Sequence, residues 1–175
     1  MEGESVMTAE ACVEACRTRL VSETPLKTDC GMHCGARCCQ SMDGEETGML
    51  LFPGEAARYA GNVDYQIVQN GTRTLLICQG HCDRKDRPLS CMLFPLLPQI
   101  QNDMVRVRMD ERARGVCPLY DSGVYGVSES FAESVRACGE MLGADPVCRK
   151  MLEQLQEEQR ELRQMRKIFQ RGKNV

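Results

Sequence analysis

The sequence contains no tryptophan, and aromatic residues supply only 5% of the chain, so large aromatic rings contribute little to its core. At 175 residues the chain is nevertheless long enough to bury a core within one domain. The apolar run at residues 49–52 is far too short to cross a bilayer. The first residues include Glu2 and Glu4 where a secretory signal would carry positive charge. We therefore expect a cytoplasmic protein.

The sequence also lacks the motifs that identify common enzyme classes. It has no glycine-rich dinucleotide motif, no phosphate-binding loop, no His-Glu-x-x-His and no Gly-x-Ser-x-Gly. Cys34 follows His33 and Cys82 follows His81, but sequence neighbours seldom reach the geometry of a catalytic pair. We therefore predict no catalytic residues, and whether the protein is an enzyme by itself stays open.

Charge gives no indication of a polyanionic partner. The formal net charge is −3, so the chain as a whole does not attract nucleic acid or anionic lipid. Few aromatic side chains are present to stack on bases. We expect neither a nucleic acid nor a membrane to be its partner.

Cysteine, by contrast, is abundant, with twelve residues in the chain. Eight of them fall between residues 30 and 117: Cys30, Cys34, Cys38, Cys39, Cys78, Cys82, Cys91 and Cys117. In a reducing compartment such clustering indicates a metal site or catalysis rather than a disulfide framework. Eight thiolates suffice for two four-thiolate sites, each suited to zinc or to an iron–sulfur cluster. We predict that these eight are metal ligands, for zinc or alternatively for iron or an iron–sulfur cluster.

Neighbouring residues leave some alternatives open around these ligands. Because Cys38 and Cys39 are adjacent, their thiolates would more easily reach different ions, or different sides of a cluster, than one tetrahedral ion. Imidazole also binds zinc, so His33 and His81 are alternative ligands, although a supporting or surface position is favoured for both.

Three segments together carry a family resemblance. They are residues 34–39 (Cys-Gly-Ala-Arg-Cys-Cys), residues 87–95 (Arg-Pro-Leu-Ser-Cys-Met-Leu-Phe-Pro) and the pair Cys117-Pro118. This pattern, spanning about residues 30–119, resembles the YkgJ-type cysteine-cluster family, which is described as a zinc- or iron-chelating domain. The resemblance implies a bound metal or iron–sulfur centre, with the eight cysteines as its ligands. Here both gaps before Cys38 have three residues, where the family commonly has two.

The pattern of residues predicts an α+β fold: a small metal-stabilised, cysteine-rich domain with a β-hairpin, flanked by N-terminal and C-terminal helices. Helices are predicted over residues 8–21, 128–142 and 146–170, with a short one over residues 53–59. β-Prone runs at residues 64–69 and 72–78 flank Asn70-Gly71, which is typical of a hairpin turn. Residues 104–108 alternate and predict another strand. Residues 28–48 read as loop with short helical turns.

The other four cysteines lie in the predicted helices, where they favour core packing, with a third four-thiolate site as the alternative. We assign residues 1–143 to the metal-binding domain, with a cluster core at 30–119, and residues 144–175 to a C-terminal amphipathic helix. That helix carries a heptad-like apolar seam: Met151, Leu155, Leu162, Met165 and Phe169. It either docks on its own domain or associates with a protein partner or a second copy of the chain.

Two functions from different classes are compatible with these features. In the first, the cysteines chelate zinc or iron in a module whose role is mainly structural or in protein interaction. In the second, they hold an iron–sulfur cluster that transfers electrons or assists a redox reaction. Four-thiolate sites serve both, so spacing does not separate them.

Overall fold

The computed structural model describes residues 7–40, 48–80 and 82–171, and these form an α+β fold with two small antiparallel sheets. Its α-helices are α1 (Ala9–Leu20), α2 (Gly31–Cys34), α3 (Ala56–Tyr59), α4 (Leu89–Leu93), α5 (Glu129–Ala144) and α6 (Pro146–Arg171). Its strands are β1 (Gly48–Leu50), β2 (Tyr65–Asn70), β3 (Arg73–Cys78), β4 (Leu96–Gln101) and β5 (Met104–Met109). No helix among the described residues is both long and apolar enough to cross a membrane.

The three-stranded sheet contains the predicted hairpin. Strand β3 lies between β1 and β2, and all pairs are antiparallel. Asn70 pairs with Arg73, so the two-residue turn is Gly71-Thr72, one residue later than the predicted Asn70-Gly71. Gly71 has a φ of +62°, a conformation that glycine adopts without the steric cost of a side chain. Strand β3 ends at Cys78, so this sheet carries one of the predicted ligands at its end.

The second sheet contains one predicted strand and one that the sequence pattern did not indicate. Strand β5 matches the alternating residues 104–108, but it pairs with β4 rather than joining the hairpin. The turn between them uses Asn102 and Asp103, both at positive φ. Asparagine and aspartate enter that region more readily than other residues with a side chain, so the turn forms without glycine.

Helices α1, α5 and α6 start where side chains can cap them. The Thr8 hydroxyl accepts a hydrogen bond from the amide of Ala11, and Ser128 caps α5 in the same way. The Asp145 carboxylate accepts bonds from the amides of Val147 and Cys148 at the start of α6. These helix boundaries agree with the predicted ones to within two residues.

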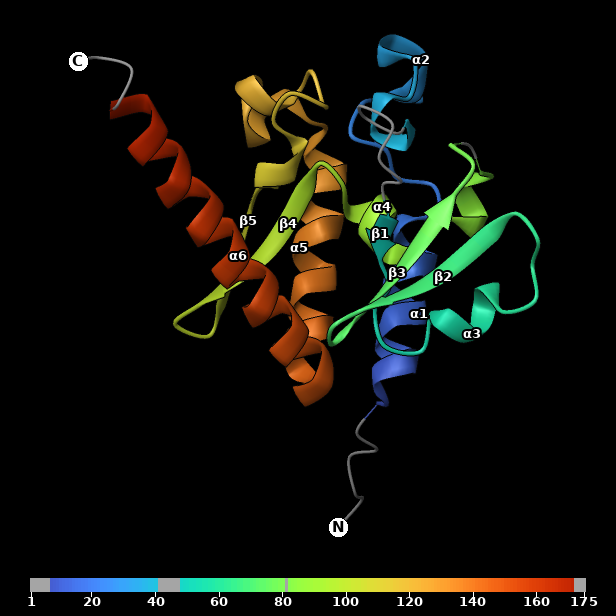
Figure 1. Ribbon diagram of the computed structural model, residues 1–175. Coiled ribbons are helices and arrows are strands. Elements are labelled where there is room, and N and C mark those ends of the chain that lie inside the picture. The colour runs from blue at the N-terminus through green and yellow to red at the C-terminus, as the bar shows by residue number, and fades with distance from the viewer. Residues whose placement is uncertain (1–6, 41–47, 81, 172–175) are drawn as a thin grey trace.

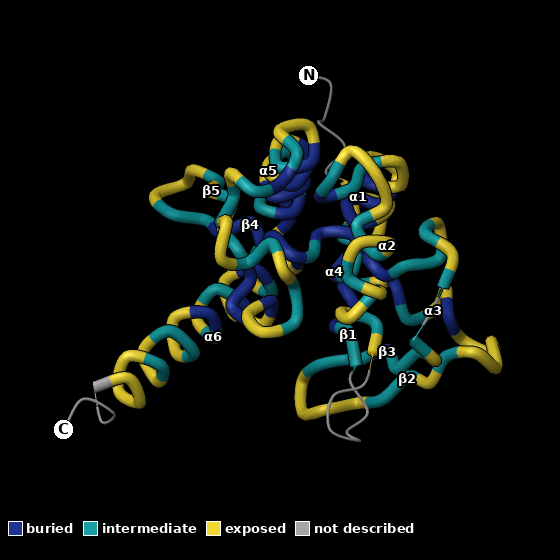
Figure 2. Tube along the Cα trace, turned by 90° about the horizontal axis from the view of Figure 1, so that it is seen from above, coloured by how far each residue is buried: buried dark blue, intermediate teal, exposed yellow. Residues whose placement is uncertain are grey.

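The main hydrophobic core lies where α1, α4, α5 and the first half of α6 meet strand β4. Figure 1 shows these helices beside β4 and β5, with the three-stranded sheet and α3 on the other side of α1. Gly139 on α5 permits close approach to the sheet, because a Cβ there would lie 2.6 Å from side-chain atoms of Pro98 and Val105. In Figure 2 the buried segments gather around α5, α1 and α4, whereas the far half of α6 is mostly exposed.

Candidate metal site

All eight predicted cysteines line two adjoining cavities at one end of the three-stranded sheet. The sheet-side cavity, of about 200 Å³, is lined by Cys38, Cys39, Cys78, Cys82 and Cys91. The loop-side cavity, of about 120 Å³, is lined by Cys30, Cys34, Cys38, Cys91 and Cys117. Each cavity thus has three cysteines of its own, and Cys38 and Cys91 lie on the wall that the two cavities share.

Five separate segments supply these thiols. Strand β3 ends at Cys78, Cys82 lies in the loop that follows, and Cys91 lies on α4. Cys117 lies in the irregular segment after the 3₁₀ turn η3 (Glu111–Ala113). The remaining four belong to a helical pair: Cys30 precedes α2, Cys34 ends it, and Cys38 and Cys39 lie in the 3₁₀ turn η1 (Arg37–Cys39). Residues 28–40 are therefore loop with short helical turns, as predicted, and residues 41–47 of the predicted segment lie outside the described residues.

A sharp turn separates the two pairs within that segment. Gly35 and Ala36 both have positive φ, at 63° and 51°. The chain therefore cannot continue α2 into η1, and residues 30–39 do not form one helix with their cysteines on a common face. As a result Cys38 faces both cavities, whereas its neighbour Cys39 faces only the sheet-side cavity. Both thiols thus line the sheet-side cavity, and whether they would bind different ions or different sides of a cluster stays a prediction.

The donor set fits a thiolate-bound metal in chemical type and grouping, but the side chains lie further apart than the ligands of a single bound ion. Within residues 7–40, 48–80 and 82–171, no three cysteine, histidine, aspartate or glutamate side chains are close enough together to hold one metal ion. His33 lines the loop-side cavity and bonds to the Thr28 hydroxyl at 3.0 Å. His81 lies outside the described residues.

Arg87 provides positive charge to both cavities. It lines each of them, its charge acts to lower the pKa of the nearby Cys82 thiol against the larger effect of burial, and its buried Nε atom has no hydrogen-bond partner among the described residues. The neighbouring Cys38 side chain, together with the charge of Arg87, lowers the pKa of Cys39 to about 6. Burial raises the pKa of Cys91 well above its ordinary value. The Cys39 thiol is thus readily ionised, whereas the buried Cys91 thiol needs a cation beside it to ionise.

Sequence reasoning missed several residues of the site. Tyr65 from β2 and Phe94 after α4 line the sheet-side cavity, together with Arg112. The Asp110 carboxylate binds Arg112 at 2.5 Å, which fixes that guanidinium at the cavity edge. Phe94 belongs to the motif that carries the family resemblance, so its position beside the site could have been anticipated. Nothing in the local pattern marks Tyr65 or Arg112.

The four other cysteines lie in the helical core. Their exposed fractions are 2% or less, and they come from α1 (Cys12, Cys16), α5 (Cys138) and α6 (Cys148). The thiols of Cys16 and Cys138 each donate to the other residue's carbonyl oxygen at 3.7 Å, and Cys148 donates to Ala9. These positions agree with core packing, the reading that the sequence favoured.

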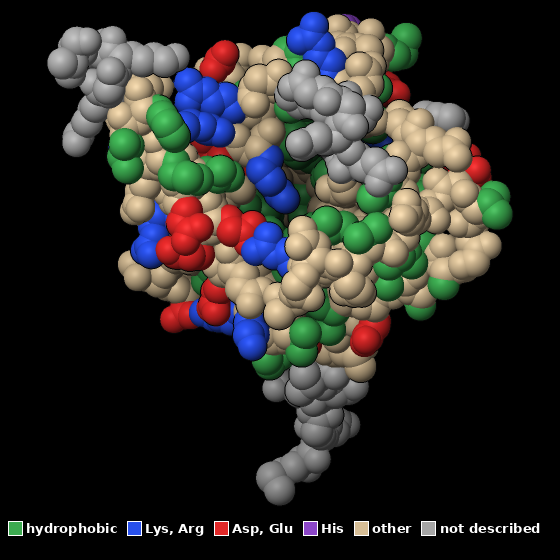
Figure 3. All heavy atoms as spheres, in the orientation of Figure 1, with side chains coloured by type: hydrophobic (Ala, Val, Ile, Leu, Met, Phe, Trp, Pro, Cys, Tyr) green, Lys and Arg blue, Asp and Glu red, His purple; other side chains and the backbone are tan. Residues whose placement is uncertain are grey.

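Helix α6 divides into a docked half and a projecting half. Leu155 is buried and Met151 half-buried in the main core, and Gln159, only 1% exposed, binds residues 110 and 111. Beyond it, Arg163 and Arg166 form ion pairs with Glu111. On the opposite side the far half exposes three large apolar side chains: Met165, Ile168 and Phe169. Figure 3 shows hydrophobic side chains grouped at this end of the helix, near the C-terminus.

Comparisons with models of protein families, with curated proteins and with solved structures found no match to this chain. The resemblance to the YkgJ-type family therefore remains a prediction.

Proposed function

We propose that this protein binds metal through its eight clustered cysteine thiolates, as a zinc- or iron-chelating module of the kind that the resemblance to the YkgJ-type family implies. The observation that carries the proposal is that all eight cysteines line the two adjoining cavities, although their segments lie far apart in sequence. The other four described cysteines are buried in the helical core instead. This division by location separates ligand candidates from packing residues.

Charge supports the same proposal. Four thiolates around a divalent ion leave a site with net negative charge, which nearby cations stabilise. Arg87 meets this need at both cavities, and Arg112 and Arg37 lie at the sheet-side cavity. Among the described residues, neither Arg37 nor Arg87 has a carboxylate within ion-pair distance, and the charges of the Cys82 and Cys39 thiolates raise the pKa of Arg87. Positive charge is therefore left to balance the sulfurs.

The size of the cavities favours the second candidate, an iron–sulfur centre with an electron-transfer or redox-accessory role. Zinc–sulfur distances of about 2.3 Å would draw four thiolates around a single ion. The sheet-side cavity, at about 200 Å³, is much larger than one ion needs, since one water molecule occupies about 30 Å³ in the liquid. A cluster of several iron and sulfide atoms would fill more of such a space than a single zinc ion. A reducing, cytoplasmic setting is part of either candidate, because both need reduced thiols.

Metal analysis of the full chain, purified without oxygen, tests the proposal and separates the two candidates. We expect bound metal: a brown protein with visible absorption and acid-labile sulfide establishes an iron–sulfur centre, and a colourless one with zinc establishes the chelating module. Absence of metal above background in fresh protein, with thiols paired as disulfides, would overturn the proposal.

Serine substitutions supply matched controls. Cys78→Ser and Cys117→Ser each alter one cavity, whereas Cys91→Ser alters the wall shared by both. We expect Cys91→Ser to lose the most metal. Cys148→Ser, in the core, can keep its bond to the Ala9 carbonyl and should keep the full metal content. Equal metal loss in the Cys148 and Cys91 variants would contradict the assignment of ligands.

A further inference from the structure

The segment of residues 84–91, which joins Cys82 to Cys91 and carries Arg87, is held along its length by side chains from distant elements. The Arg84 guanidinium donates to the carbonyl oxygens of Leu20 and Val21, at the end of α1. The Ser90 hydroxyl donates to the carbonyl oxygen of Leu50 on β1. The residues between these two points are held by a group of buried polar side chains.

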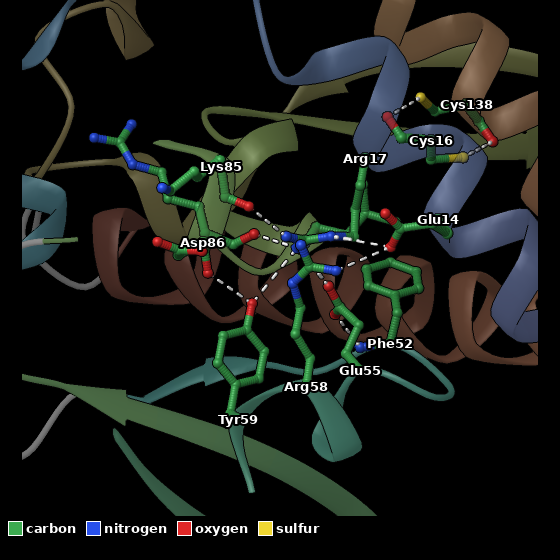
Figure 4. A network of polar contacts seen from close by, with 12 residues as sticks. Glu14, Cys16, Arg17, Phe52, Glu55, Arg58, Tyr59, Lys85, Asp86 and Cys138 are labelled. Atoms are coloured by element: carbon green, nitrogen blue, oxygen red, sulfur yellow. Dashed lines mark hydrogen bonds and ion pairs between the residues drawn. The ribbon is translucent and has the colours of Figure 1, made fainter. Parts of the chain in front are cut away.

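Arg17 on α1 is the centre of this group, with only 3% of its surface exposed. Its guanidinium donates to the carbonyl oxygen of Lys85 at 2.9 Å and to that of Arg87. It also binds the Glu55 carboxylate at 3.1 Å. Figure 4 shows the Arg17 side chain pointing from α1 toward the backbone near Lys85, with Glu55 and Tyr59 converging on it from the α3 region.

Glu55 and Tyr59 hold the same segment from the other side. The Glu55 carboxylate accepts the amide of Leu89 at 2.7 Å and the amide of Phe52 at 2.8 Å. The Tyr59 hydroxyl donates to the carbonyl oxygen of Asp86 at 2.8 Å. Main-chain groups of four of the five residues 85–89 are thus bonded to these three side chains.

Burying Arg17 and Glu55 costs free energy of desolvation, so their role is better explained by the backbone that they hold in place. A buried ion pair seldom adds net stability, because removing both charges from water costs about as much as their attraction returns. Burial raises the pKa of Glu55 despite the lowering effects of the two amides and of Arg17, so its desolvation is not fully offset. What the pair does provide is a fixed backbone path between two thiols of the site.

The other half of the site has no such support. The side-chain hydrogen bonds of residues 29–40, in the part of the chain that the structure describes, all stay within residues 28–40. In Figure 1 the α2 segment lies at one end of the molecule, beyond α4. One half of the thiol-lined site is therefore anchored to the core, and the other is anchored mainly to itself.

We propose that the buried Arg17–Glu55 pair positions residues 84–91, so that this half of the site is formed before metal binds and the metal then fastens residues 29–40 onto it. The inference rests on the proposed metal-binding function. Preorganisation of this kind lowers the cost of binding, because fewer groups must be ordered when the metal arrives.

Two measurements on the full chain test this. Hydrogen exchange of the metal-free protein should find the Leu89 amide protected in the wild type and unprotected in Arg17→Met. Cobalt(II), used as a visible probe of thiolate ligation, should bind the Arg17→Met protein at least tenfold more weakly, with an altered spectrum, and Arg17→Lys should restore part of the affinity. Adding metal to the wild type should slow exchange more in residues 29–40 than in residues 84–91.

Controls separate positioning from loss of stability. Leu152→Ala truncates a fully buried core residue away from both cavities, and at an equal folded fraction it should bind cobalt like the wild type. If Arg17→Met does not fold, Glu55→Leu, which removes the acceptor of the Leu89 amide, provides the same comparison. A variant of the pair with wild-type affinity and spectrum, or metal-induced protection that is equal in the two segments, would overturn the inference. Failure of the wild type to bind cobalt or zinc, in a protein that also contains no iron or acid-labile sulfide, would instead refute the proposed function.

Discussion

Replacing Gln159 by leucine should destabilise the protein substantially, although the substitution keeps the side chain similar in size. Gln159 donates to the Asp110 carboxylate at 3.0 Å and accepts the amide of Glu111 at 2.5 Å, and only 1% of its surface is exposed. Leucine leaves the backbone amide of Glu111 buried without an acceptor, and it removes the hydrogen bond to the Asp110 carboxylate. Together these losses amount to about 2–4 kcal/mol. For a chain of this length that corresponds to a fall in melting temperature of about 5–15 °C.

Urea denaturation and thermal melting, both followed by circular dichroism, measure this effect. Gln164→Leu is the matched control, because Gln164 lies on the same helix but is exposed, and it should change stability by less than about 0.5 kcal/mol. The two variants have the same change in composition and helix propensity, so their difference isolates the buried contacts. If Gln159→Leu unfolds at the same urea concentration as its control, the argument that these two bonds hold α6 to residues 110 and 111 is wrong.

Three other perturbations have defined outcomes. Phe131→Ala removes a fully buried ring from the main core and should cost about 3–5 kcal/mol by urea denaturation, and a loss below about 1 kcal/mol would contradict its central position. Burial raises the pKa of Glu55, so the stability that this residue contributes is greatest below the ordinary carboxyl pKa and falls as pH rises through the raised value. The wild type should therefore lose stability relative to Glu55→Gln between those two pH values. A difference in unfolding free energy that stays constant across pH would argue against the pKa shift. Met165→Glu and Phe169→Glu should leave metal content and folding unchanged but abolish any self-association or partner binding through α6, because both side chains are exposed on its projecting half. Analytical sedimentation measures the mass in solution, and an unchanged mass distribution would exclude self-association through this helix.

Local sequence signals predicted most of the fold. The hairpin followed from two β-prone runs around Asn70-Gly71, and the residues typical of caps at Thr8 and Asp145 lie where α1 and α6 begin. Strand β4 was not indicated, because it contains Pro98 and an apolar run without alternation, and its turn to β5 has no glycine. The separation into two sheets depends on packing against α5, which short-range patterns do not encode.

The candidate site was predictable in composition but not in arrangement. Clustering in the sequence marked the eight cysteines, yet their division between two cavities depends on how five segments meet. One reason that the arrangement was not predictable is the positive φ of Ala36, a residue that seldom adopts this conformation. The Arg17–Glu55 pair is another, since its members lie 38 positions apart and look like ordinary surface charges in the sequence.

The distance along the chain between the cavity-lining cysteines has a consequence for how the protein matures. Cys30 and Cys117 line the same cavity, yet both sheets and the short helices α2, α3 and α4 lie between them in the chain. Contacts between residues so distant form late in folding, because closing a long loop costs chain entropy before it brings any contact. If the proposed metal binding is correct, a metal ion would therefore not nucleate this fold as it does in a short zinc finger with neighbouring ligands. The ligand thiols would stay unprotected until the chain has folded, and the yield of metal-loaded protein should then depend on metal supply and on reducing conditions during folding.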